Sequence, residues 1–395
     1  MSPYSVLEIG EYVAAPYAGK LFSGIGADVL KVEPPEGDVA RRVGPFYEDD
    51  PRPENSGYFA YLNTGKRSVT LDPESDEAPA AIRALIEQEG IDLVIETALR
   101  EYGVDPEALC EEYTELTVTS ISGFGATGPF QEFEAPEIVA AAESGQMNKM
   151  GYPEQPPTRV RIKALDYMGG EYAAFSSMAA LFTRDNVSGE GQYVDVSSRE
   201  AGTSSLEFFI PGYSYSGETT QRTGTGYARQ GEDQEGFPTI YPAADGHFSA
   251  AVNTPDTWKA FCEHILEDPE LADDERFNTL DSIIENSLQA REIIEDYTSQ
   301  HEKWELLEEF QAVGIPSAVT ATPEDVAEFE HLKEREFWQD VPLSNGEEVT
   351  MPGFAFRLNK ETIEMERPPR LGEHNKKVYG EAGFDLERLE SAEVI

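Results

Sequence analysis

Asp166 is the residue whose type and setting most clearly allow chemistry. It precedes two adjacent glycines, Gly169 and Gly170, and a run of small residues that is typical of a helix. An aspartate in front of a helix caps it, but it can also act as a nucleophile, because the helix dipole stabilises its ionised form. The glycines would let a bulky substrate approach closely. From the residues alone, capping is the simpler interpretation.

Other charged residues accompany Asp166. Arg159, Arg161 and Lys163 alternate along the segment before it, so they would share one face of an extended chain and could bind a substrate carboxylate. Glu137 is predicted near the start of an earlier helix, where the dipole favours an acid. The functional alternative is that Glu137 faces Asp166.

The elements that must position these residues alternate between strand and helix patterns. Residues 5–10, 28–33, 91–96 and 116–122 are short apolar or alternating runs, with amphipathic segments between them. This order predicts a Rossmann-like α/β domain with an open sheet, which binds ligands at the carboxyl ends of its strands. No GxGxxG follows the first strand and no GxxxxGK[ST] occurs, which argues against dinucleotide and P-loop sites.

Two features of this half suit a ligand that carries phosphate. Lys66 and Arg67 lie together between a turn and a strand, where they would contact phosphate or pair with neighbouring acids. The Gly-rich segment 123–130, which includes Gly125, follows a strand, where open sheets bind ligands. Such a segment can also be an ordinary turn.

The charge of the chain is extreme. Its 76 acidic and 30 basic residues give a formal net charge of −46. Nucleic acids and anionic membranes would repel it, so neither is an expected partner. Because the acids are spread along the chain, we expect adaptation to high salt, with an ordinary acidic protein as the alternative.

Length and local composition predict the number of domains and the cellular location. A chain of 395 residues predicts two domains. We expect a large domain over 1–200 completed by 345–395, a smaller α+β domain over 225–325, and linkers at 201–224 and 326–344. Long apolar and signal-like segments are missing, which predicts a cytoplasmic protein. The two cysteines lie in unlike contexts and predict neither a disulfide framework nor a metal site.

Seven segments carry a resemblance that runs almost end to end. They are AAPYAGKLFSGIGADVLKVEPPEGDVAR, LNTGKRSVTLD, SGFGATGPF, PEIVAAAESG, ALDYMGGEYAAFSSMAALFTRDNVSGEGQYVDVSSREA, GIPSAVTATPEDV and RPPRLGEHN. In these segments the chain resembles the family III CoA-transferases, which include formyl-CoA transferase and carnitine CoA-transferase. Together with the acidic composition, the resemblance indicates a haloarchaeal member.

The resemblance implies a reaction and a set of site residues. Asp166 would form a mixed anhydride with an acyl-CoA and then an aspartyl-CoA thioester, with Glu137 supporting it. No permanently bound cofactor and no metal is implied, since the CoA thioester is itself a substrate. CoA binding is assigned to Arg41, Lys66, Arg67, Arg100 and Gly125. Substrate or oxyanion contacts are assigned to Arg159, Arg161, Gly169, Gly170, Gly224 and Gly226.

The resemblance also implies an interlocked homodimer and, by analogy, succinyl-CoA as donor with a C4 or C5 dicarboxylate such as mesaconate as acceptor. Two departures stand out: Val13 replaces a family glutamine, and the loop after Glu96 is shortened. Two alternatives remain, a racemase of the same fold and a non-catalytic acyl-CoA binding protein. The racemase pattern has a histidine where this chain has Pro136.

Overall fold

The protein consists of two compact units. The computed structural model describes residues 4–207, 209–219, 222–224, 226–227, 237–392 and 394–395. Unit 1 comprises Met1–Ser144, Val160–Ser204 and Glu330–Ile395, and unit 2 comprises Gly145–Arg159 and Ser205–Phe329. The expected small domain, 225–325, falls inside unit 2, which also takes in the short segment before Val160.

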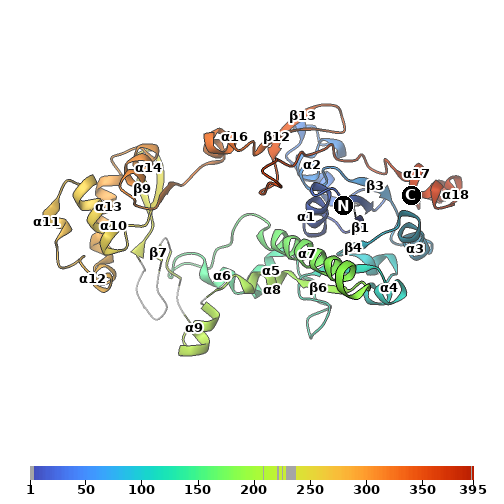
Figure 1. Cartoon of the computed structure of the whole chain (residues 1–395), viewed down its shortest axis with the longest axis horizontal. Helices are drawn as coiled ribbons and strands as arrows, with labels where there is room; N and C mark the ends of the chain where they lie inside the picture. Colours follow the sequence, from blue (N-terminus) through green and yellow to red (C-terminus); the bar gives the residue numbers. More distant parts are fainter. Residues whose placement is uncertain (1–3, 208, 220–221, 225, 228–236, 393) are drawn as a thin grey trace. The chain divides into compact units, whose positions relative to one another are not determined.

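Unit 1 is built on a six-stranded parallel sheet (Figure 1). Its strands are β1 (Ser5–Ile9), β2 (Asp28–Glu33), β3 (Arg67–Thr70), β4 (Leu93–Glu96), β5 (Thr117–Ser122) and β6 (Tyr193–Ser197). Their spatial order is β3-β2-β1-β4-β5-β6, and every neighbouring pair is parallel. This is the doubly wound order, so the expected Rossmann-like open sheet is confirmed.

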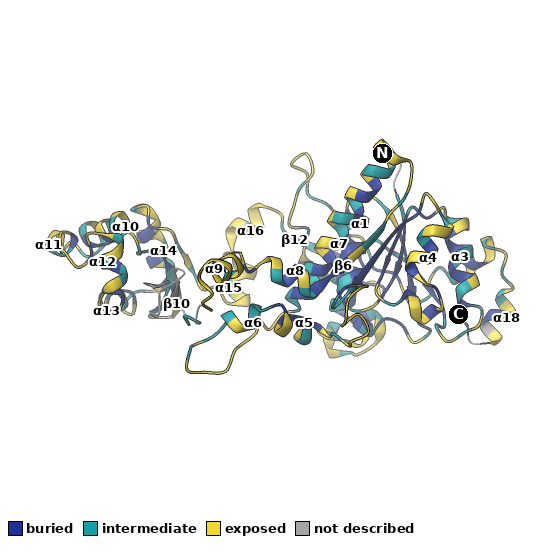
Figure 2. Ribbon diagram, turned by 90° about the horizontal axis from the view of Figure 1, so that it is seen from below, coloured by how far each residue is buried: buried dark blue, intermediate teal, exposed yellow. Residues whose placement is uncertain are grey.

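Helices cover both faces of this sheet, and alternate residues of each strand supply the two cores. Val6 of β1 packs with Phe22 beneath α1 and α7, whereas its neighbour Leu7 packs with Ile82 of α3 on the other face. Figure 2 shows the strands as the buried layer, with exposed surface on the outer sides of the helices. The helices of unit 1 are α1 (Ala14–Gly24), α2 (Gly57–Leu62), α3 (Ala78–Glu89), α4 (Pro106–Glu112), α5 (Glu137–Glu143), α7 (Ala164–Thr183), α8 (Ser198–Ser204), α16 (Glu330–Glu334), α17 (Asn375–Glu381) and α18 (Leu386–Ser391).

The C-terminal part of the chain completes unit 1. An antiparallel hairpin of β12 (Trp338–Pro342) and β13 (Glu348–Pro352) packs against Ala60 of α2 through Val341 and Met351. Further on, α17 and α18 join the core beside α3. Residues from the two ends of the sequence therefore build one core.

Unit 2 is a smaller mixed part with its own core. Its three-stranded antiparallel sheet has the order β11-β10-β9, and its core includes Trp258, Phe261 and Phe310. The strands of unit 2 are β7 (Gly226–Tyr227), β8 (Phe237–Pro238), β9 (Ile240–Ala243), β10 (Gly246–Ala250) and β11 (Ser317–Val319). Its helices are α6 (Gln146–Lys149), α9 (Phe209–Ser216), α10 (Pro255–Ala260), α11 (Pro269–Ala272), α12 (Leu280–Glu285), α13 (Ser287–Thr298), α14 (Lys303–Ala312) and α15 (Pro323–Glu328).

Neither a membrane-spanning helix nor a metal site is present among the described residues. None of the helices combines the length and apolar character needed to cross a bilayer. No group of three or more His, Cys, Asp or Glu side chains in the same residues is placed to hold a metal ion.

Candidate active site

Asp166 lies in the first turn of α7, and Lys163 is the residue that precedes this helix. The prediction placed Asp166 in front of the helix, which is wrong by one turn because α7 already begins at Ala164. The side chain is half-buried. Burial raises the pKa of Asp166 to about 6, Glu137 adds to the rise, and the Lys163 cation opposes it. An aspartate in this state is still mostly ionised at neutral pH but poorly solvated, as a carboxylate nucleophile must be.

Glu137 is the first residue of α5, and it is 5% exposed. Its charge helps to raise the pKa of Asp166, so the structure brings these two carboxylates close together from different helices. Pro136, immediately before it, offers no side-chain group for proton transfer. The pair therefore consists of carboxylates alone, one buried and one half-buried.

A group of tyrosines that the sequence analysis did not select surrounds the first turn of α7. The side chains of Tyr58 and Tyr167 lie close enough to influence each other's pKa. Tyr167 packs edge-on against Tyr17 with ring centroids 4.8 Å apart, and Tyr12 lies 5.5 Å from Tyr58. Burial raises the pKa of Tyr58 and of Tyr167, so both hydroxyls stay protonated and can donate hydrogen bonds. Their only sequence signal is the density of tyrosines in α2 and after Asp166.

A cavity of about 390 Å³ opens beside these tyrosines, wholly within unit 1. We call it the tyrosine-lined cavity. It is lined by Pro45, Phe46, Tyr47, Asn55, Gly57, Tyr58, Tyr61, Tyr167, Leu343, Val349, Thr350, Met351 and Pro352. A mostly apolar cavity with a few hydroxyl groups, beside Tyr167 and so next to Asp166, has the character of a site for a small, largely apolar ligand.

The loop between β1 and α1 also borders this region, and its backbone is strained. Tyr12 has a φ of 71°, which is costly for a residue with a side chain. The conformation is held because the Tyr12 N–H donates a 3.0 Å hydrogen bond to Oδ1 of Asp38. The Lys163 ammonium lies 5.0 Å from the centroid of the Tyr12 ring. Val13 is 1% exposed, and its apolar side chain offers a substrate no hydrogen bond.

Two residues assigned to CoA binding are buried structural cations, and this part of the prediction needs correction. The Arg41 guanidinium is 1% exposed and contacts Glu33 through two hydrogen bonds of 2.7 Å. The Lys66 ammonium is fully buried, 2.6 Å from Glu8 and hydrogen-bonded to the backbone carbonyl of Pro16. Because nearby carboxylates already neutralise both cations, neither presents an exposed charge to a phosphate.

Arg67 is likewise occupied, whereas Arg100 and Gly125 share a cavity. Arg67 pairs with Asp28 and Glu89 at the edge of the sheet. Arg100, which pairs with Asp105, lines a cavity of about 350 Å³ at the carboxyl ends of β4 and β5, and Gly125 lines it as well. Of the predicted CoA contacts, the structure brings only these two together at a ligand-sized opening.

Gly169 and Gly170 pack helices rather than line a substrate site, which corrects their predicted role. A Cβ on Gly169 would come within 2.7 Å of Ser198 Oγ, and one on Gly170 within 2.7 Å of the Ala14 carbonyl. Both glycines lie beyond the first turn of α7, where each N–H bonds to the carbonyl four residues earlier. These N–H groups are therefore not open to an oxyanion.

The remaining predicted residues lie in more exposed segments. Arg161 belongs to unit 1 and Arg159 to unit 2, and both are exposed. Gly224 has a φ of 60°, close to Tyr152 within unit 2, and Gly226 belongs to β7. Thr225, between these two glycines, lies outside the described residues.

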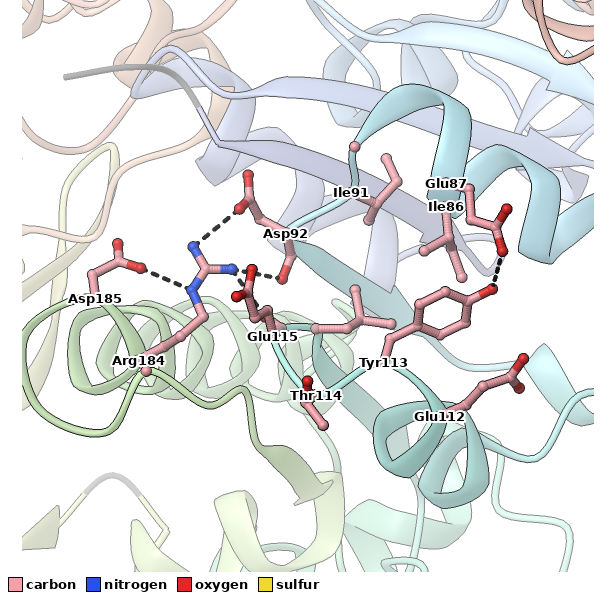
Figure 3. A pocket seen from close by; sticks show the side chains of 13 residues that line it. Ile86, Glu87, Ile91, Asp92, Glu112, Tyr113, Thr114, Glu115, Arg184 and Asp185 are labelled. Atoms are coloured by element: carbon pink, nitrogen blue, oxygen red, sulfur yellow. Dashed lines mark hydrogen bonds and ion pairs between the residues drawn. The ribbon is translucent and has the colours of Figure 1, made fainter.

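A larger cavity, of about 680 Å³, lies near the amino ends of β4 and β5 (Figure 3). Figure 3 shows Arg184 directed toward Asp92 and Asp185, with N–O distances of 3.0 and 2.8 Å. The Arg184 guanidinium also donates to the Glu115 carbonyl at 3.1 Å. None of the predicted site residues lines this cavity, so size alone does not locate the active site.

The fold and the site define a class of protein: a doubly wound α/β protein with a half-buried carboxylate, a second buried carboxylate and an adjoining cavity of acyl-group size. Comparison with known families makes this specific. Residues 1–375 match CoA-transferase family III. The chain belongs to this family and is a CoA-transferase.

Several relatives match nearly the whole chain. The succinyl-CoA:mesaconate CoA-transferase of Haloarcula hispanica is 32% identical over 394 residues, covering 96% of this chain and 95% of that one. The succinate–glutarate CoA-transferase of Agrobacterium fabrum is 30% identical, with 96% and 95% covered. A crystal structure of a CAIB/BAIF family protein from Brucella suis superposes with a TM-score of 0.81 at 29% identity, covering 96% of this chain and 98% of that one.

Proposed function

We propose that Asp166 is the covalent nucleophile of CoA transfer. The observation that carries this proposal is the half-buried carboxylate, whose pKa is raised to about 6 between Glu137 and Lys163. Between pH 7 and 8 it is mostly ionised, and the surrounding tyrosines keep it poorly solvated. These are the conditions in which a carboxylate attacks a thioester.

The reaction runs through two covalent states. The Asp166 carboxylate attacks the acyl-CoA carbonyl, the C–S bond breaks, and a mixed anhydride and a CoA thiolate result. The thiolate then attacks the aspartyl carbonyl, which forms an aspartyl-CoA thioester and releases the first acid as its carboxylate. The acceptor carboxylate repeats these steps in reverse, so the thioester bond is conserved. Excluding water matters because an anhydride hydrolyses readily.

Each neighbouring side chain has a separate role in the proposed reaction of Asp166. The Lys163 cation favours ionised Asp166 before attack. Glu137, close enough to raise the pKa of Asp166, is positioned to orient the acceptor or to move a proton. The hydroxyls of Tyr58 and Tyr167 can donate hydrogen bonds to the oxyanions that form at each acyl carbon. This assignment replaces the predicted oxyanion contacts of Gly169 and Gly170.

Substrate identity is proposed from the relatives together with the tyrosine-lined cavity. Relatives in Haloarcula hispanica and Agrobacterium fabrum are named for succinyl-CoA with mesaconate and for succinate with glutarate. We therefore propose succinyl-CoA as the donor and a C4 or C5 dicarboxylate such as mesaconate as the acceptor. The CoA moiety would bind near Arg100 and Gly125, at the carboxyl ends of β4 and β5.

We also propose a homodimer and a halophilic protein. Tyr172, Phe175 and Phe182 share one side of α7 and are 46, 75 and 63% exposed, and such an apolar stripe marks an interaction surface. Sedimentation at molar salt tests this proposal, and a monomer would contradict it.

The net charge of −46 supports a requirement for salt, which thermal unfolding across a salt series tests.

Replacement of Asp166 tests the proposed nucleophile. Asp166→Ala and Asp166→Asn should abolish exchange of CoA between acids while CoA binding persists. Glu111→Gln, which alters an exposed acid of α4, is the matched control and should exchange normally. Exchange by Asp166→Ala at the wild-type rate would overturn the proposal.

A further inference from the structure

Lys20, on α1, is a buried cation that the proposed reaction does not use. It is 1% exposed, and its Nζ has no hydrogen-bond partner among the described residues. The other buried lysines of the described chain each contact a carboxylate; they are Lys31, Lys66 and Lys303. Burying an amine without such a partner is costly, so its position calls for a physical reason.

Lys20 lies directly behind one wall of the tyrosine-lined cavity. Its Nζ is 3.3 Å from the centroid of the Tyr61 ring and 5.2 Å from that of Phe354. Tyr61 lines the cavity, whereas Lys20 does not. The ammonium group is thus separated from the cavity by a single aromatic ring, which an ammonium contacts favourably.

The cavity itself has no charged wall. None of the residues that line it is an aspartate, glutamate, lysine or arginine. A carboxylate that enters such a space loses its hydration, and hydrogen bonds from the tyrosine hydroxyls compensate for the lost hydration free energy only in part. A positive charge just behind the wall would offset the remainder, because the protein interior screens Coulomb attraction far less than water does.

We propose that Lys20 determines acyl specificity: its amine, carrying a proton, attracts the second carboxylate of a dicarboxylic acyl group held against Tyr61. This inference rests on the CoA transfer proposed above and deepens it, since it names the group that selects a dicarboxylic acyl chain over a monocarboxylic one. Lys20 would be a positioning residue that acts through Tyr61, without contacting the reacting carbonyl.

The charge of Lys20 would depend on the ligand. Burial, together with the nearby Lys66 cation, lowers the pKa of Lys20 to about 6, so in the empty enzyme the amine is mostly neutral at pH 7. Lys66, which pairs with Glu8, acts on it directly, and Tyr61 packs against it with Tyr17, Tyr167 and Glu171 close to that tyrosine, while Phe354 contributes an uncharged ring. A carboxylate in the cavity raises the pKa of Lys20, so a dicarboxylic acyl group binds together with a proton.

Two donors of equal chain length provide the test. The values of kcat/KM for succinyl-CoA and butyryl-CoA are measured with one acceptor at molar salt, and their ratio is the readout. Lys20→Met should lower the succinyl preference at least about tenfold, whereas Lys20→Arg should largely restore it. Lys377→Met, which changes an exposed lysine of α17, should leave the ratio unchanged. An unchanged ratio in Lys20→Met would overturn the proposal.

The pH dependence gives a second readout that needs no variant. In the wild type the succinyl preference should fall between pH 6 and 8, because uptake of a proton by Lys20 becomes harder as pH rises. A wild-type preference that stays constant over this range would overturn the proposal even if Lys20→Met fails to fold. If the wild type transfers CoA from neither donor, the proposed function fails and this inference with it; transfer from both with an insensitive ratio refutes only the role of Lys20.

Discussion

Two charged clusters in unit 1 use the same residue types in opposite ways. Around Lys31, two cations match two carboxylates: the Lys31 Nζ lies 2.9 Å from Glu8 and 2.8 Å from Asp38, and the Lys66 Nζ lies 2.6 Å from Glu8, with all four side chains fully buried. Around Asp166, two carboxylates face a single cation, Lys163, and the pKa of Asp166 is raised.

The two clusters differ in whether each buried charge has an opposite charge in direct contact with it. Burial opposes the charge of Lys31, but Asp38, Glu8 and Glu33 outweigh it and raise the pKa of this lysine. This matched network fixes the end of β1 and, through Asp38, the strained Tyr12 loop beside the site. The unmatched cluster keeps the pKa of Asp166 raised, as the proposed nucleophile requires. We conclude that the first cluster maintains the shape on which the second depends.

Breaking the matched network should have the largest effect on stability. Lys31→Met leaves Asp38 buried without its cation and Glu8 with Lys66 alone, so we expect a loss of roughly 3 to 5 kcal/mol in the free energy of unfolding. Calorimetry at molar salt measures it. An exposed control, Lys376→Met, should unfold as the wild type does. Equal stability of Lys31→Met would show that the network does not hold the fold.

Removing the second carboxylate of the unmatched cluster should affect turnover more than stability. Glu137→Gln should lower kcat by about 10²-fold, the usual scale for loss of an acid or base. Because Glu137 raises the pKa of Asp166, the acidic limb of the kcat profile should also move to lower pH. A profile that stays in place would contradict the closeness of the two carboxylates.

Removing the Lys163 cation should move the acidic limb of the kcat profile to higher pH. Lys163 opposes the rise in the pKa of Asp166, so Lys163→Met should raise that pKa further above about 6. Less carboxylate is then available in mildly acidic solution, and activity at pH 6 should fall by roughly three- to tenfold. Rates measured from pH 5 to 8 decide this, and a shift toward lower pH would be inconsistent with the proposed site.

A similarly small effect is expected at the cavity proposed for CoA, where Arg100 pairs with Asp105 but is far more exposed than Arg67. Arg100→Ala should raise KM for the acyl-CoA by roughly three- to tenfold through a lost phosphate contact, with kcat little changed. Arg67→Ala should not change KM, because Arg67 is held by Asp28 and Glu89. Equal increases in both variants would mean that CoA binds elsewhere.

The sequence predicted the fold better than the roles of single cations. The strand pattern at residues 28–33 shows a strand, but not that Glu33 turns inward to bind Arg41. The same holds for Glu8 and Lys66, which come from distant segments and meet only in the folded core. A basic residue at a turn is therefore indistinguishable, by sequence alone, from an exposed phosphate ligand.

Small and aromatic residues were misjudged for a related reason. In the sequence, two adjacent glycines such as Gly169 and Gly170 are compatible either with a substrate contact or with close packing of helices. The contacts with Ala14 and Ser198 in the folded protein show that they pack helices. Tyr58 and Tyr167 are ordinary core candidates until the fold places them side by side. The expectation that Glu137 faces Asp166 came from the resemblance, and the roles of both residues stay a prediction, although Glu137 does raise the pKa of Asp166.

The most direct test of the central claim is chemical trapping of Asp166. The enzyme is incubated with succinyl-CoA and then with hydroxylamine, and its peptides are analysed by mass spectrometry. An activated acyl group on Asp166 would yield a hydroxamate at that residue, in the wild type and in Glu111→Gln alike, and only in the presence of acyl-CoA. Full exchange activity with no modification of Asp166 under these conditions would contradict the account.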